Sequence, residues 1–143
     1  MKVKIKRIDK SIPLPTYQTE GSVGFDIYTR QETVIQPGEI KLIPGNIIIQ
    51  VPSGFGLFIV SRSSTPSRFG LLMPHGFGVL DQDFCGPEDE LCLQFYNFSQ
   101  KPVRIKKGTR IAQAVLVRIE KAELEEVETV VSKNTRGGFG STG

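Results

Sequence analysis

The chain has 143 residues, is 38% hydrophobic and 23% charged, and carries a formal net charge of +3. This length and composition predict one globular domain with a real core, and the mild positive charge suits a small polyanionic ligand rather than a nucleic acid. Because the sequence has no continuous run of about 18 apolar residues, we expect neither a membrane-spanning helix nor a membrane partner.

Short β-strands are predicted along most of the chain. Residues 1–7 alternate lysines with Val3 and Ile5, which predicts a strand with one solvated face and is unlike the apolar stretch of a signal peptide. Apolar residues then predict strands, in chain order, at 23–28, 47–51, 56–60, 91–96 and 111–117. Because Pro and Gly turn signals separate these strands, we expect an all-β fold, either an antiparallel sandwich or a barrel.

Helix signals are poor outside one short stretch. The best candidate is 65–69, where Thr65 can cap the helix and Pro66 stands at its first position. The later charged stretch 121–131 ends in Thr129-Val130-Val131, three residues that favour a strand.

Two cysteines and a single histidine limit the chemistry of the chain. Cys85 and Cys92 lack the spacing of a redox or zinc motif, so we expect free thiols in a reducing compartment and a cytoplasmic location. With His75 alone, a histidine-rich metal site is excluded, and no orienting motif supports a Cys85–His75 nucleophile pair.

The segment Ser61-Arg62-Ser63-Ser64 follows an apolar strand directly and precedes the expected helix. An arginine and hydroxyl groups at such a point form a plausible anion site. The alternative is a capping cluster with a surface arginine.

The segment 75–86 places an aromatic residue between glycines and follows it with two acids, Asp81 and Asp83. The exposed backbone of a hairpin can hydrogen-bond to a base edge, and Asp81 can polarise a water molecule. On a strand the two acids would share one face. The alternative is a β-turn with solvated acids.

Arg110 and Gln113 stand in a turn that leads into a predicted strand. Because they are three positions apart, a regular strand would place them on opposite faces. Either one serves a ligand and the other the structure, or a bulge realigns them.

The C-terminal segment 136–143 places Phe139 among glycines and small hydroxyl residues, beside Arg136. A glycine-rich segment cannot fold alone, yet this one has an aromatic face for stacking on a base and groups that bind phosphate. We therefore expect one domain over 1–133 and a flexible arm over 134–143 that closes over a nucleotide. The alternative is a disordered tail.

Five segments, in this order, resemble the motifs of the trimeric dUTP pyrophosphatase (dUTPase) family. They are residues 21–28, 61–64, 78–86, 108–113 and 138–143. Each segment alone is weak or moderate as a signal, whereas the ordered set, which covers nearly the whole chain, is highly specific.

The resemblance implies a fold, an assembly and a reaction. The fold would be a jelly-roll-like β-barrel with one short helix, and the assembly a homotrimer whose active sites lie between subunits. The arm of one subunit would cover the site of a neighbour. The reaction would be Mg²⁺-assisted hydrolysis of dUTP to dUMP and pyrophosphate, which keeps uracil out of DNA and supplies dUMP for dTMP synthesis.

The resemblance also implies roles for individual residues. Asp81 would activate the water that attacks the α-phosphate, a task that suits an ionised carboxylate. Phe84 stands where the family usually has a tyrosine against the deoxyribose, and Asp26 would support the water shell of Mg²⁺, which the triphosphate mainly holds. The remaining substrate-binding positions implied are Arg62, Ser63, Ser64, His75, Gly78, Val79, Leu80, Arg110, Gln113, Arg136, Gly138, Phe139, Gly140 and Ser141.

The chain departs from the family pattern at several of these positions. His75 stands where some members have an asparagine that contacts uracil. The second motif usually continues with Gly-Leu-Ala, whereas Ser64-Thr65-Pro66 follows here, and the arm arginine usually stands at the position of Asn134. The role of Arg110 is left open between phosphate binding and structure.

Two rival functions remain to be weighed. The related dCTP deaminase family shares the fold and has a similar 95–97 segment, but it has a glutamate where this chain has Gln94, and an amide cannot shuttle protons. A dUTPase-like binding or regulatory protein is the other alternative, and the presence of Asp81 argues against it, because binding alone does not require this acid.

Overall fold

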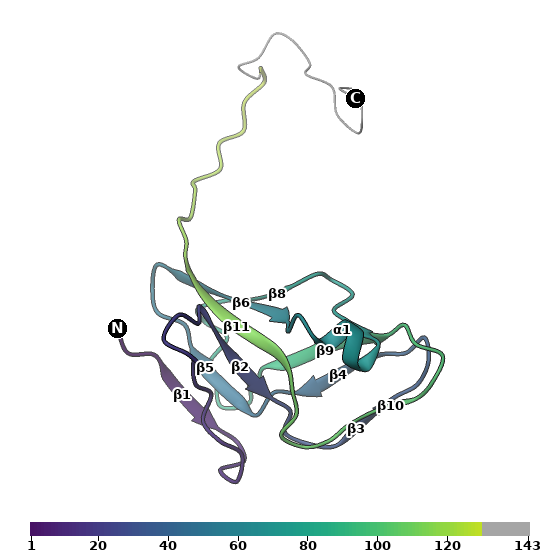
Figure 1. Cartoon of the computed structure of the whole chain (residues 1–143). Helices are drawn as coiled ribbons and strands as arrows, with labels where there is room; N and C mark the ends of the chain where they lie inside the picture. Colours follow the sequence, from purple (N-terminus) through teal and green to yellow (C-terminus); the bar gives the residue numbers. More distant parts are fainter. Residues whose placement is uncertain (130–143) are drawn as a thin grey trace.

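The structure is a computed structural model and describes residues 1–129. Within that range, eleven strands and one short helix follow one another along the chain (Figure 1). They are β1 (Lys4–Arg7), β2 (Gly24–Tyr28), β3 (Thr33–Ile35), β4 (Ile40–Pro44), β5 (Ile47–Gln50), β6 (Phe55–Ser61), α1 (Thr65–Phe69), β7 (Leu71–Leu72), β8 (Gly78–Leu80), β9 (Cys92–Asn97), β10 (Val103–Ile105) and β11 (Arg110–Arg118).

Antiparallel pairing joins the strands into four sheets. The largest has the order β2-β11-β6-β8 and the next has the order β4-β9-β7, while β1 pairs with β5 and β10 with β3. This arrangement confirms the predicted all-β, jelly-roll-like fold. The expected barrel is not closed, because the ladders of residues 1–129 stay in separate sheets.

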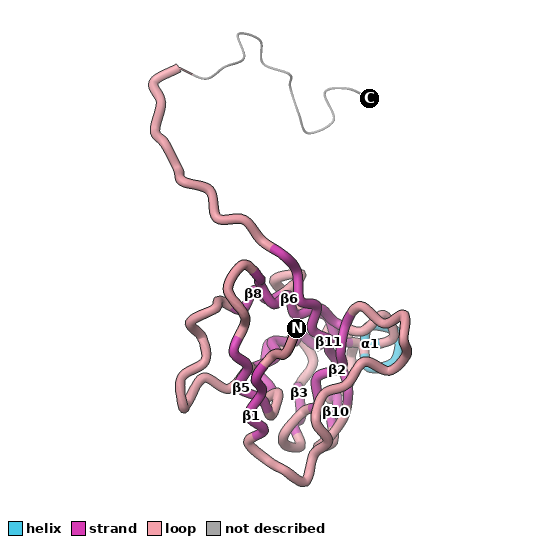
Figure 2. The backbone as a smooth tube through the Cα atoms, turned by 90° about the vertical axis from the view of Figure 1, so that its left-hand side faces the viewer, coloured by secondary structure: helices cyan, strands magenta, loops and turns pink. Residues whose placement is uncertain are grey.

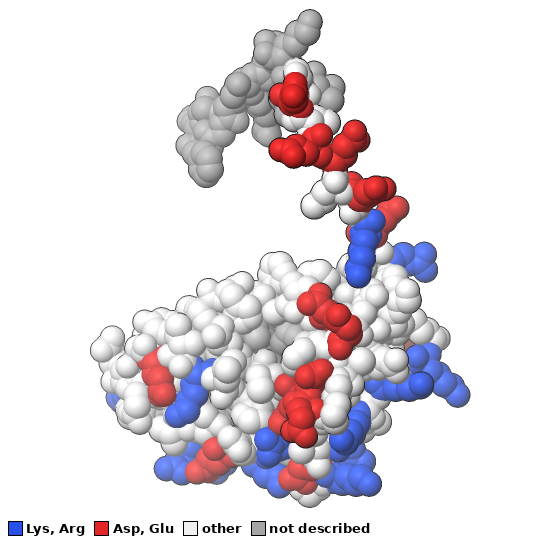
Figure 3. All heavy atoms as spheres, turned by 180° about the vertical axis from the view of Figure 1, so that it is seen from behind, with Lys and Arg blue, Asp and Glu red and all other residues white. Residues whose placement is uncertain are grey.

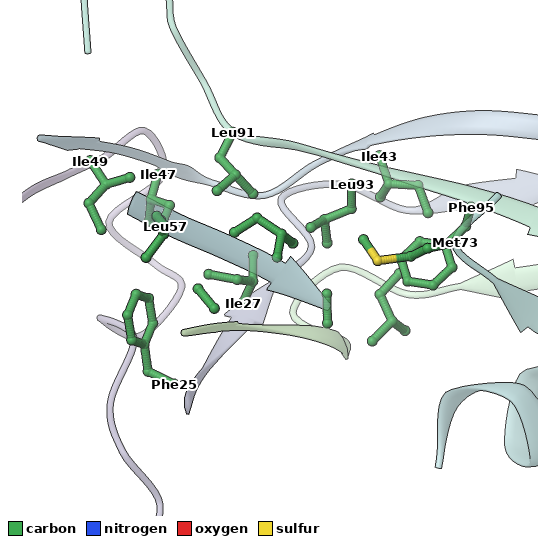
Figure 4. Packing of buried hydrophobic residues seen from close by; sticks show 14 of the residues in the cluster. Phe25, Ile27, Ile43, Ile47, Ile49, Leu57, Met73, Leu91, Leu93 and Phe95 are labelled. Carbon is green, nitrogen blue, oxygen red and sulfur yellow. The ribbon is translucent and has the colours of Figure 1, made fainter. Parts of the chain in front are cut away.

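The core lies between the two larger sheets. Ile27 and Leu57 from one sheet and Leu93 and Phe95 from the other are fully buried in a single cluster (Figure 4). Full burial of each such side chain stabilises the fold by about 1.5–3 kcal/mol. The alternation of apolar and polar residues that predicted the strands therefore also determines which face of each strand packs inward.

The predicted helix is present at α1, but its cap differs from the prediction. Ser64, rather than Thr65, occupies the N-cap position, and its side chain makes no capping hydrogen bond. Pro66 stands in the first turn as expected. Gly70 ends the helix with a φ of 67° and donates its backbone N–H to the carbonyl of Pro66 at 2.9 Å, a left-handed conformation that favours glycine.

Beyond β11, the chain leaves the body of the molecule as an extended segment (Figures 1 and 2). Residues 121–129 are exposed and form no strand, and the strand predicted for Thr129-Val130-Val131 falls mostly outside the described residues. Acidic side chains gather on this segment (Figure 3), at Glu120, Glu123, Glu125, Glu126 and Glu128. Among the helices of residues 1–129, none is long and apolar enough to cross a membrane.

Candidate active site

Two groups of the predicted site residues lie at opposite ends of β6. Leu80 on β8 pairs with Leu57, so Asp81 lies level with Gly56 at the start of β6. Arg62 follows the last residue of the same strand. At a strand rise of about 3.3 Å per residue, these two levels are roughly 20 Å apart.

The first group, which we call the arginine corner, consists of Asp26, Arg62, Arg110 and Gln113. Asp26 stands in the middle of β2 and is only 5% exposed. Its Oδ1 lies 2.9 Å from Nε of Arg62, and its Oδ2 accepts a hydrogen bond of 3.0 Å from Nη1 of Arg110. One buried carboxylate therefore orients two half-buried guanidinium groups, as charge-assisted hydrogen bonds with defined directions do.

A bulge in β11 brings Arg110 and Gln113 to the same face. Arg110 pairs with Tyr28 and Ala112 with Ile27, so Ile111 is an extra residue in the ladder. After this shift Gln113 pairs with Asp26. The bulge that the sequence left as an alternative is therefore present, and it gathers the polar groups that a regular strand would separate.

Gln113 lies directly over Gly24 of β2. A Cβ placed on Gly24 would come within 3.0 Å of Oε1 of Gln113 and 3.3 Å of the Ala114 carbonyl oxygen. Gly24 thus provides the space in which the Gln113 side chain lies, which explains why a glycine precedes Asp26 by two positions.

Ser63 and Ser64 lie in the turn between β6 and α1. The backbone N–H of Thr65 donates to the Arg62 carbonyl at 2.9 Å and closes this turn, which leaves both serines exposed. Among residues 1–129, neither serine hydroxyl has a hydrogen-bond partner. The turn therefore presents two hydroxyl groups next to Arg62, an arrangement that suits an anionic ligand.

The second group surrounds what we call the Asp81 hollow, a depression of about 360 Å³. Its lining combines acidic, basic and aromatic side chains, among them Asp81, Asp83, Lys121, Phe55 and Phe58. Lys121 was not singled out in the sequence, and only the charged character of its segment could have indicated it.

Asp81 and Asp83 lie in a turn and not on a strand. β8 ends at Leu80, so the shared strand face considered for the two acids does not exist, and both are exposed. Gln82 holds the turn against β6, because its Nε2 donates to the Phe55 carbonyl at 2.8 Å. Phe84 follows and remains 39% exposed.

The hairpin before Asp81 borders a second depression of about 270 Å³. His75, Gly78, Val79 and Leu80 line it together with Gln94, among others. A Cβ on Gly78 would lie 3.4 Å from Cβ of Ile59, which is ordinary contact, so space alone does not exclude a side chain there.

Cys92 also lines this second depression, and burial, reinforced by Glu90, raises the pKa of its thiol. Glu90 itself forms a bidentate pair with Arg30, at 2.8 and 2.9 Å, which raises the pKa of that arginine further. Cys85 and Cys92 are both free thiols, as predicted.

Five predicted site residues cannot be placed. Arg136, Gly138, Phe139, Gly140 and Ser141 lie outside the described residues. Their roles therefore remain those implied by the sequence.

The described donor groups suit a magnesium ion that a ligand brings with it. In residues 1–129, no group of three or more His, Cys, Asp or Glu side chains is arranged to hold a metal. Both oxygens of Asp26 accept bonds from arginines, but a carboxylate has further lone-pair sites that can accept hydrogen bonds from metal-bound water. Mg²⁺ keeps several waters and is commonly bound through substrate phosphates and one or two carboxylates, so these residues fit such an ion.

Comparison with known proteins gives a consistent result along the chain. The family model described as dUTPase matches residues 10–143. A deoxyuridine 5'-triphosphate nucleotidohydrolase of Thermoanaerobacter sp. (strain X514) is 39% identical, covering 99% of this chain and 97% of the relative. A protein of the same name from Nautilia profundicola is 36% identical, covering 100% and 99%. Among solved structures, the dUTPase of Staphylococcus bacteriophage 80alpha with dUPNHPP is 26% identical, with a TM-score of 0.87 and coverage of 99% and 98%.

Proposed function

Because this chain belongs to the dUTPase family and is a dUTP nucleotidohydrolase, we propose that its active site combines the Asp81 hollow of one subunit with the arginine corner of another. The assembly would be a homotrimer, as the resemblance implies. dUMP and pyrophosphate would be the products.

One observation carries this proposal, namely the separation of Asp81 and Arg62 along β6. The water that Asp81 activates and the arginines that bind the triphosphate must all reach one phosphate chain. Since the two groups lie roughly 20 Å apart on one chain, a single subunit does not bring them together at one α-phosphate.

An exposed apolar face supports the association of subunits. The outward positions of the β4-β9-β7 sheet include Ile40, Leu42 and Leu72, which are 52%, 60% and 38% exposed. Gln94 and Tyr96 on β9 face the same side, and none of these residues is charged. A contiguous uncharged patch of this kind is typical of an interface between proteins.

The chemistry would begin with Asp81 as general base. Its carboxylate accepts a proton from a water molecule, whose oxygen forms a bond to the α-phosphorus while the bond to the bridging oxygen of the β-phosphate breaks. Pyrophosphate leaves with that oxygen. The exposure of Asp81 at the edge of a hollow is consistent with this role, because the attacking water must enter from solvent.

The arginine corner would hold the triphosphate and offset its charge. Arg62, Ser63 and Gln113 would bind phosphate oxygens, while Asp26 keeps both guanidinium groups in place. When bound, Mg²⁺ would neutralise further phosphate charge, and Asp26 would support its water shell. Arg110 would act mainly through its bond to Asp26.

The hairpin of the subunit that provides Asp81 would select the nucleotide. The backbone of residues 78–80 would hydrogen-bond to uracil, with no space for the methyl group of thymine, and His75 would lie beside the base. Phe84 would pack against the deoxyribose and exclude a 2′-hydroxyl. The arm residues Arg136 and Phe139 would contact the γ-phosphate and stack on uracil, with Gly138, Gly140 and Ser141 close to the nucleotide.

The first experiment is a substrate panel. Pyrophosphate release is measured from dUTP, dCTP, dTTP and UTP, with Mg²⁺ and then with a chelator, while chromatography follows the base. We expect Mg²⁺-dependent release from dUTP alone. Conversion of dCTP to a uracil nucleotide would show deaminase activity, and turnover of UTP at a similar rate would contradict the role of Phe84.

A second experiment tests the shared site. Asp81→Asn and Arg62→Ala subunits, each inactive alone, are unfolded together, refolded and assayed. If Asp81 and Arg62 come from different subunits, random mixing restores about one quarter of the sites, because each required side chain is intact in half of the subunits. If both residues serve the same site from one chain, no mixture regains activity.

Where the enzyme works is a further proposal. Free thiols at Cys85 and Cys92 favour a reducing, intracellular compartment. There it would supply dUMP for dTMP synthesis and keep uracil out of DNA.

A further inference from the structure

Thr65 is a buried polar residue that the mechanism above does not use. It is fully buried at the first position of α1, and its hydroxyl does not cap that helix. Instead, Oγ1 donates a hydrogen bond of 2.8 Å to the backbone carbonyl of Ile111. A buried hydroxyl with a defined partner far away in the sequence requires an explanation.

The acceptor of this hydrogen bond is the extra residue of the β11 bulge. Ile111 has no partner in the ladder with β2, because the register passes from Arg110 to Ala112. Its carbonyl accepts a second hydrogen bond of 3.2 Å from the backbone N–H of Arg62. The Ile111 carbonyl therefore accepts hydrogen bonds from both ends of the turn, namely from the N–H of Arg62 and from the hydroxyl of Thr65.

The same carbonyl is close in sequence to the proposed phosphate-binding residues of β11, and the turn bound to it carries the others. Ile111 follows Arg110 directly and precedes Gln113 by two positions, while the turn it anchors carries Ser63 and Ser64. The bond from Thr65 thus fixes the turn between β6 and α1 relative to the bulged strand. Without it, only the Arg62 N–H would join the turn to Ile111.

We propose that Thr65 is a positioning residue for dUTP hydrolysis, whose hydroxyl holds the Arg62–Ser64 turn in register with Arg110 and Gln113. The inference rests on the proposed function of the arginine corner. Thr65 itself does not touch substrate, since it is fully buried. A small misplacement of groups that bind a reacting phosphate lowers the rate strongly. The groups then no longer lie at hydrogen-bonding distance from the oxygens on which negative charge develops in the transition state.

The test compares three variants at 25 °C, where each is shown to be folded. Thr65→Val keeps the shape of the side chain and removes the donor, whereas Thr65→Ser keeps the donor and removes a methyl group. Ser67→Ala is the matched control, because Ser67 donates to the Ser64 carbonyl from an exposed position on the same helix. We expect Thr65→Val to lower kcat about tenfold with a much smaller change in KM. Thr65→Ser and Ser67→Ala should stay within about twofold of the wild type.

A second measurement is independent of catalysis. Amide hydrogen exchange of residues 62–65 should become faster in Thr65→Val, while that of β4 and β9 stays unchanged. The proposal is overturned if Thr65→Val loses thermal stability but keeps kcat, if Thr65→Ser is impaired as strongly as Thr65→Val, or if exchange at 62–65 does not change. Absence of dUTP hydrolysis in the wild type would instead contradict the proposed function, and the exchange result would still decide whether Thr65 anchors the turn.

Discussion

The polar groups at the two ends of β6 differ in burial and in pairing. At the arginine corner, a buried carboxylate is paired with two guanidinium groups, and long-range contacts determine the position of each. At the Asp81 hollow, two acids stand exposed in a turn, among aromatic and apolar side chains, Gln82 and Lys121. The first region is organised before substrate binds, whereas the second is open to water and incomplete.

Under the proposed function, this difference would correspond to a division of roles between phosphate binding and water activation. Phosphate binding needs positive groups held at fixed positions, and the protein provides them with its own counter-ion. Water activation needs an ionised carboxylate that solvent can reach, and Asp81 meets that need at the edge of a hollow. In the proposed active site, each chain would carry two half-sites, and association of chains would complete them.

The largest effect on activity is expected for a substitution in the Asp81 hollow, at the start of β6. Asp81→Asn should lower kcat by about 10²–10⁴-fold, because an amide cannot accept the proton of the attacking water. Affinity for dUPNHPP, measured by calorimetry, should be preserved. Asp83→Asn is the matched control, since Asp83 lines the same hollow; an equal loss in that variant would mean that the charge of the hollow matters rather than Asp81 itself.

The next largest effect on activity is expected for a substitution in the arginine corner. Asp26→Asn should lower kcat/KM by about 10²-fold, because both arginines lose the charge that orients them. It should also destabilise the fold by about 1–3 kcal/mol in urea unfolding, since a buried group loses charge-assisted hydrogen bonds. Glu32→Gln, which removes an exposed pair with Arg104, should cost less than about 1 kcal/mol and leave activity unchanged. Wild-type kinetics in Asp26→Asn would show that activity does not depend on the orientation of Arg62 and Arg110 by Asp26.

A selectivity change is expected at Phe84. Phe84→Ala should reduce discrimination between dUTP and UTP by about tenfold, because the ring no longer occupies the space of a 2′-hydroxyl. Phe84→Tyr keeps the ring and should retain discrimination. Competition assays with dUTP and UTP measure the ratio of their kcat/KM values directly. Unchanged discrimination in Phe84→Ala would show that the deoxyribose does not pack against Phe84.

The smallest effect is expected at Gly24. In Gly24→Ala the new Cβ would lie 3.0 Å from Oε1 of Gln113, so the amide must shift by a few tenths of an ångström. We expect kcat/KM to fall about threefold to tenfold while the fold is retained. Gly21→Ala is the control, because nothing lies within 4 Å of its Cβ position. Equal kinetics in the two variants would exclude a role for the placement of Gln113.

Local patterns predicted the helix and six of the eleven strands of residues 1–129, and did not predict β3, β4, β7, β8 and β10. Alternation in β1 and β9 and dense β-branched residues in β5 indicated the strands, and Pro66 indicated the helix. The errors were local as well. Thr65 was expected to cap α1, but its hydroxyl donates to a carbonyl 46 positions away.

Residue types and their order along the chain were enough to predict the family and the kind of ligand. A nucleotide requires particular hydrogen-bond donors, acids and aromatic rings, whatever their surroundings. The placement of these groups was decided by pairing between distant segments. Asp26 meets Arg110 across 84 positions, the bulge at Ile111 turns Arg110 and Gln113 to one face, and β6 keeps Asp81 away from Arg62. Such contacts depend on strand register, which the burial of the whole core determines and no single motif contains.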